Sequence, residues 1–172
     1  MSKYLEQLSP EEAKSLLRLL SKENSKLAAR IEELAKAKIS DVDADNVADD
    51  VYRVLVSIDV EDLWNRPNGS NRFRYVEPVE AAYEMVEEAL EPFAEQLKKY
   101  RKLAMYQEMK RVGLGIANGI LKFTKEGQTE FKKWAPDDAM EWLGGLLMEW
   151  EKGCTDENEK KCIREMNQLL EG

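Results

Sequence analysis

Histidine is absent from this chain of 172 residues. Imidazole is the side chain that most often transfers protons near neutral pH, and it is also a common zinc ligand. Its absence excludes Ser-His and Cys-His nucleophile pairs and every metal site that contains histidine. An enzyme with this sequence would have to work with carboxylates, lysines, tyrosines or a bound metal.

Cysteine is nearly absent as well, with Cys154 and Cys162 the two present. They are eight positions apart in a segment with a helical pattern, which separates their α-carbons by about 12 Å if both lie on one helix. That distance is too long for a disulfide. We expect two reduced thiols, although the exclusion is weaker if Cys154 lies in a loop before the helix that carries Cys162.

Long apolar runs are missing too. No stretch approaches 18 uncharged apolar residues, and the first residues have no apolar segment of signal-peptide length. We therefore expect a cytoplasmic protein without a membrane contact.

Charge, by contrast, is abundant, at 35% of residues with a net charge of −8. Residues 1–65 carry 9 basic and 14 acidic groups, residues 66–133 carry 13 and 10, and residues 134–172 carry 4 and 10. The middle third, at +3, is thus the one basic segment of an acidic protein. Such a small excess does not favour nucleic-acid binding.

Helix signals dominate the N-terminal segment. Ser9-Pro10-Glu11-Glu12 combines a capping serine, a proline at the first helical position and acids in the first turn. It predicts a short helix to about residue 20, followed by a polar break at residues 21–25. An apolar stripe then predicts a second helix, so that residues 1–40 form a helical hairpin. The stripe consists of Leu27, Ala28, Ile31, Leu34 and Ala35.

The alternating acids of Asp41-Val42-Asp43-Ala44-Asp45 invite comparison with a calcium-binding EF-hand loop. The pattern fails at the sixth position, Asn46, where glycine is required, and at the twelfth, Tyr52, where glutamate is required. We expect these acids to cap the following helix. Ser57 is then expected to cap a short turn that contains Val60.

Further helices are predicted from residue 78 onwards. The apolar spacing continues through Pro92, so that proline either kinks one helix or begins a second. Gly113, Gly115 and Gly119 lack the context of a phosphate-binding loop and predict close packing between helices. Further starts at residues 135–138 and 156 predict the last two helices.

The fold class is therefore all-α, as an irregular, solenoid-like helical repeat or a multi-helix bundle of about eight helices. We predict a single domain over residues 1–172. An alternative within it is a hairpin, residues 1–40, packed on a helical-repeat core, residues 41–172.

One loop, at residues 57–78, interrupts the helices with arginines next to aromatics. This composition is typical of protein-binding hot spots, and also of arginines stacked on core aromatics. The leading interpretation is a non-catalytic helical scaffold for protein–protein interaction, which needs no cofactor. The candidate partner-binding residues are Trp64, Arg66, Arg72, Phe73, Arg74 and Tyr75.

Two alternatives stay open. One is an all-α, magnesium-dependent nucleotide pyrophosphohydrolase, in which carboxylates three residues apart hold the metal. Its candidate ligands are Asp59, Asp62, Glu77 and Glu80. The other is an RNA-binding module that uses the same arginines and aromatics.

Three short strings, at residues 58–64, 75–83 and 90–93, resemble an uncharacterised helical region of prokaryotic proteins, some of which carry a SWIM-type zinc finger. The resemblance covers about residues 40–150 and implies a helical fold without an established activity. The zinc finger requires a cysteine cluster and a histidine. Since this chain has no histidine, the metal and DNA-binding roles of the finger are not implied.

Overall fold

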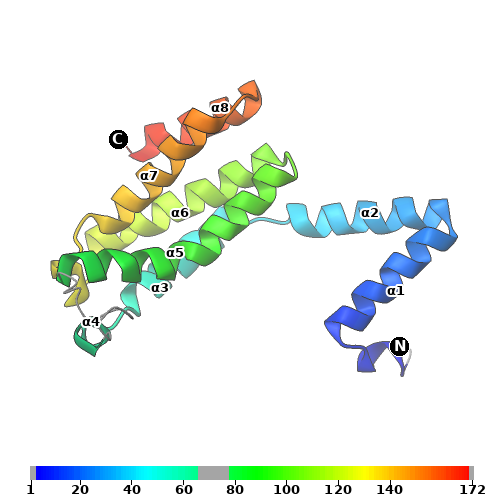
Figure 1. Cartoon of the computed structure of the whole chain (residues 1–172), viewed down its shortest axis with the longest axis horizontal. Helices are drawn as coiled ribbons and strands as arrows, with labels where there is room; N and C mark the ends of the chain where they lie inside the picture. Colours follow the sequence, from blue (N-terminus) through cyan, green and yellow to red (C-terminus); the bar gives the residue numbers. More distant parts are fainter. Residues whose placement is uncertain (1–2, 66–77, 171–172) are drawn as a thin grey trace, which may run out of the picture. The chain divides into compact units, whose positions relative to one another are not determined.

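The computed structural model describes residues 3–65 and 78–170, except for the side chains of residues 63–65, 78, 169 and 170. This part of the chain contains eight α-helices, two short 3-10 helices and no strand, which confirms the all-α prediction (Figure 1). The chain divides into two compact units, Met1–Asp41 and Val42–Gly172. We call them the N-terminal hairpin and the core bundle. The association of a hairpin with a core within a single domain stays a prediction.

The N-terminal hairpin consists of the 3-10 helix η1 (Leu5–Gln7), α1 (Pro10–Glu23) and α2 (Ser25–Ser40). The Ser9 hydroxyl accepts the Glu12 amide at 3.3 Å, and the Glu12 carboxylate accepts the Ser9 amide at 2.9 Å. This capping box confirms the predicted start. Helix α1 extends beyond residue 20 to Glu23, because a single residue, Asn24, separates it from α2. Its side chain accepts the amides of Lys26 and Leu27 at the start of α2.

The core bundle begins with α3 (Ala44–Val56). The Asp43 carboxylate accepts the Asp45 amide at 2.9 Å, so the expected capping role of the acids is confirmed. The prediction for Ser57 was wrong. Its hydroxyl donates to the Val54 carbonyl at 2.7 Å and closes α3, whereas Asp59 accepts an amide in the first turn of α4 (Val60–Asn65).

Helix α5 (Pro78–Lys102) continues through Pro92 as one element and changes direction along its length (Figure 1). Proline removes one helical hydrogen bond and crowds the preceding turn, which bends a helix without ending it. The helix ends at Lys102, and Ala104, two residues further on, has a φ of 52°. The Met105 amide donates to the Tyr100 carbonyl at 2.9 Å, which is the hydrogen bond between the first and last residues of a Schellman motif.

Helix α6 (Tyr106–Glu126) lies at the centre of the core bundle. It contacts α3, α5, α7 (Asp138–Gly153) and α8 (Glu157–Leu170), while the 3-10 helix η2 (Phe131–Lys133) precedes α7. In a solenoid each repeat contacts its sequence neighbours. Here α6 packs most extensively on α3, from which two helices separate it, so the unit is a bundle.

Glycines permit that close packing. A β-carbon at Gly115 would lie 2.6 Å from the Ala44 carbonyl oxygen, and one at Gly119 would lie 2.6 Å from that of Ala48. At Gly113 the obstacle is Met166 of α8. The sequence prediction that these glycines allow helices to approach is confirmed.

The last two helices carry the two cysteines. Cys154 is the C-cap of α7 and Cys162 lies on α8, so the alternative that Cys154 precedes the helix of Cys162 is the one that the structure shows. Both thiols are free and buried, as expected. None of the described helices has the length and apolar content needed to cross a membrane.

Candidate functional site

The loop with the predicted partner-binding residues lies largely outside the described part of the chain. Trp64 belongs to α4, and its side chain is outside the described part of the chain. The other five residues lie wholly outside it: Arg66, Arg72, Phe73, Arg74 and Tyr75. Their role in binding a partner, whether a protein or an RNA, stays a prediction.

Three of the four predicted magnesium ligands lie within the described part of the chain. Asp59 accepts the Glu61 amide at 2.9 Å, and Asp62 and Glu80 are exposed on α4 and α5. Glu77 lies outside the described residues. Within residues 3–65 and 78–170, no group of three or more acidic or cysteine side chains is placed to hold a metal ion. The hydrolase therefore stays a prediction.

A polar cluster lies where α5, α7 and α8 meet. The Arg101 Nε donates to Glu159 Oε1 at 2.5 Å, and its guanidinium lies 5.1 Å from the ring centroid of Trp150. Glu159 is 8% exposed. One guanidinium thus satisfies a buried carboxylate and stacks on an aromatic face, which joins three helices.

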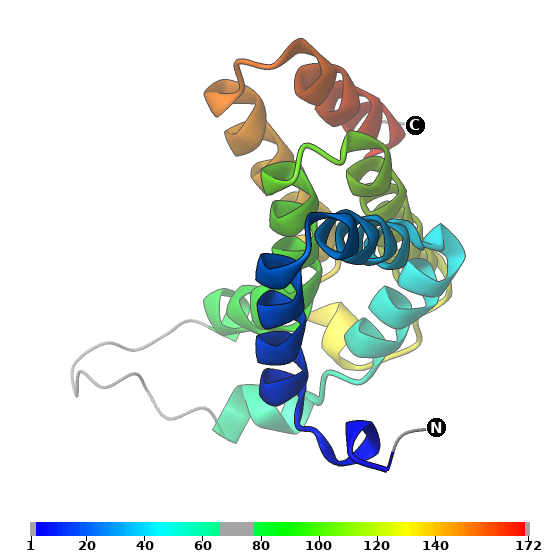
Figure 2. The same ribbon diagram turned by 90° about the vertical axis from the view of Figure 1, so that its right-hand side faces the viewer.

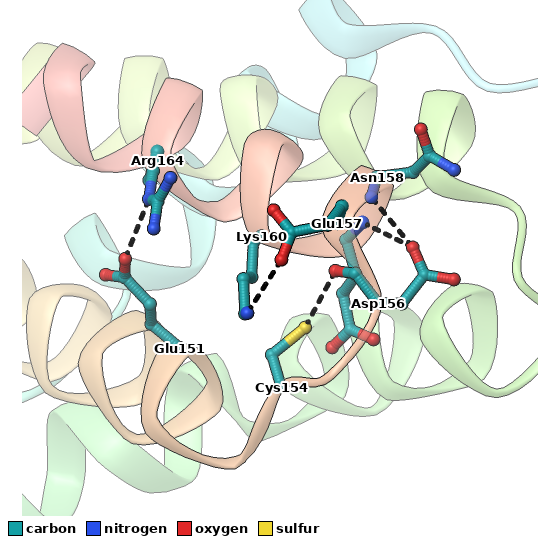
Figure 3. Close-up of polar contacts among 8 residues, drawn as sticks. Glu151, Cys154, Asp156, Glu157, Asn158, Lys160 and Arg164 are labelled. Carbon is teal, nitrogen blue, oxygen red and sulfur yellow. Dashed lines mark hydrogen bonds and ion pairs between the residues drawn. The ribbon is translucent and has the colours of Figure 1, made fainter.

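The chain between α7 and α8 closes the same region (Figure 3). The Cys154 thiol donates to the Asp156 carbonyl at 3.3 Å, and the Asp156 carboxylate accepts the amides of Asn158 and Glu159. The hydrogen bond from the Glu159 amide lowers the pKa of Asp156, whereas burial raises it. The net result is a pKa below the usual value. Burial raises the pKa of Cys154, and that of Cys162 to about 11. Thiols that stay protonated at neutral pH are poor nucleophiles.

An open hollow of about 630 Å³ lies along the connection between α6 and α7. Lys132 lines it, but its ammonium donates to the carbonyls of Thr124 and Gly127 and lies 6.0 Å from the Phe123 ring centroid. The cation therefore serves the C-terminus of α6. We find no arrangement here that would fix a ligand.

The N-terminal hairpin presents the clearest unsatisfied surface. No residue of η1, α1 or α2 is buried. Leu17, Leu19 and Leu34 are 47%, 53% and 52% exposed. Leu27, which lies between Leu19 and Leu34 in the sequence, is 36% exposed. We call these four leucines the leucine face, a name for the set and not for one patch, because Leu17 and Leu19 are two positions apart on α1 and project from different sides of it. Figure 2 shows α1 and α2 meeting at one corner, so each helix covers the other over part of its surface.

The core bundle differs in this respect. It has 28 buried apolar side chains among the described residues, and its exposed large ones are Val79, Tyr83, Leu103 and Met148. Val79 and Tyr83 are neighbours on α5, whereas Leu103 and Met148 belong to other segments. Exposed large apolar side chains are thus more frequent in the N-terminal hairpin than in the core bundle.

This site was not predicted from the sequence, although a signal was present. The apolar stripe of α2 was expected inside the hairpin, and the sequence prediction gave no separate role to the leucines of α1. Leu16, Leu17, Leu19 and Leu20 surround α1 more widely than one neighbouring helix can cover. Four leucines in five residues therefore indicate a second contact.

No protein-family model, curated protein or solved structure matches this chain. The resemblance to the prokaryotic helical region stays a prediction, and function is argued from the residues.

Proposed function

We propose that this protein is a non-catalytic helical scaffold that binds another protein chain through its N-terminal hairpin. The observation that carries the proposal is the leucine face, four exposed leucines on α1 and α2, two helices in which no residue is buried. The partner presents an apolar helical surface that covers these side chains.

Helix energetics support this proposal. Isolated helices of 14 and 16 residues, the lengths of α1 and α2, are marginally stable in water. Most helical stability in proteins comes from packing of an apolar face, and a unit of about 40 residues rarely buries enough surface alone. A partner that covers the leucine face would supply the missing burial, at roughly 25 cal/mol for each Å² of apolar surface.

The polar groups of the core bundle support a structural role for that unit. Asp43, Asp59 and Asp156 accept backbone amides at helix starts. Arg101 and Lys110 pair with carboxylates of α8, each at 2.5 Å. These groups hold helices together, which is what a scaffold requires. The arginine-rich loop stays a predicted second contact.

A site-specific photo-crosslinker tests the proposal. Benzoylphenylalanine would replace Leu19 in one full-length chain and Leu103 in another; these leucines are 53% and 50% exposed. In native extract, we expect a discrete protein adduct from position 19 and none from position 103. The adduct should weaken when the position-19 chain also carries Leu34→Glu, because the proposed partner contacts both α1 and α2. Equal labelling at both positions, or none at position 19, would overturn the proposal.

A further inference from the structure

We draw no further inference here: the strongest candidate, the leucine face of the N-terminal hairpin, belongs to the site already described, and nothing in the structure shows what covers it.

Discussion

Arg101 shows how much a single side chain contributes at the residue scale. Its guanidinium pairs with Glu159 of α8 and stacks on Trp150 of α7, while its backbone belongs to α5. A second arginine, Arg164, pairs with Glu151 at 3.0 Å between the same two helices, α8 and α7, but its side chain is 60% exposed. The two pairs therefore differ in burial, and only Arg101 also stacks on an aromatic ring.

Replacing Arg101 with alanine should destabilise the core bundle by about 2–3 kcal/mol, because it leaves the Glu159 carboxylate buried without its partner. Arg164→Ala should cost less than about 1 kcal/mol, as for other exposed pairs. Urea unfolding followed by tryptophan fluorescence measures both values, since all four tryptophans lie in residues 42–172. Equal losses in the free energy of unfolding would show that the burial of the Arg101–Glu159 pair adds nothing to its contribution.

The buried thiol of Cys162 should make the core bundle less stable at alkaline pH. Burial raises the pKa of its thiol from 9.0 to about 11, so the folded state keeps the proton longer than the unfolded state does. The resulting stabilisation is complete below pH 9 and disappears as pH rises through 11. From pH 8 to pH 10, the wild type should lose about 1 kcal/mol more than Cys162→Ala in the free energy of unfolding. Parallel losses in the two proteins would argue against a buried, protonated thiol.

At the scale of elements, two glycines hold α6 against α3. β-Carbons at Gly115 and Gly119 would meet the carbonyl oxygens of Ala44 and Ala48, each at 2.6 Å. Backbone atoms cannot yield as a flexible side chain can. The interface thus depends on the missing methyl groups.

Gly119→Ala should therefore destabilise the core bundle by about 1–3 kcal/mol, although alanine is the better helix former. Gly145→Ala is the matched control, because a β-carbon at that position would have no atom within 4 Å. It should stabilise α7 by up to about 1 kcal/mol. Chemical denaturation of both variants checks the signs. Stabilisation by Gly119→Ala would contradict the close approach of α3 and α6.

Local signals predicted many of these elements. The capping box at Ser9 and the Asp43 cap follow from side chains that bond amides within three residues. Ser57 was assigned to the wrong helix because a serine can serve either end. The end of α5 has no glycine to mark it, since Ala104 adopts the positive φ. Such choices depend on tertiary context.

At the scale of the molecule, sequence periodicity left a solenoid and a bundle open. The contact of α3 with α6 decides for a bundle, and it joins segments too distant for local patterns to pair. The site was missed for a related reason. Periodicity identifies apolar residues in α1 and α2 without showing how many of them the neighbouring helix leaves uncovered.

Binding of a partner protein to the N-terminal hairpin is tested most directly by amide hydrogen exchange of the full-length protein. Exchange would be followed for the protein alone and for its complex with the protein captured by the crosslinker at position 19. The amides of α1 and α2 should gain protection in the complex, while those of α6 stay unchanged, because the partner covers the hairpin. Hairpin protection that is the same with and without the captured protein would contradict the proposed binding surface.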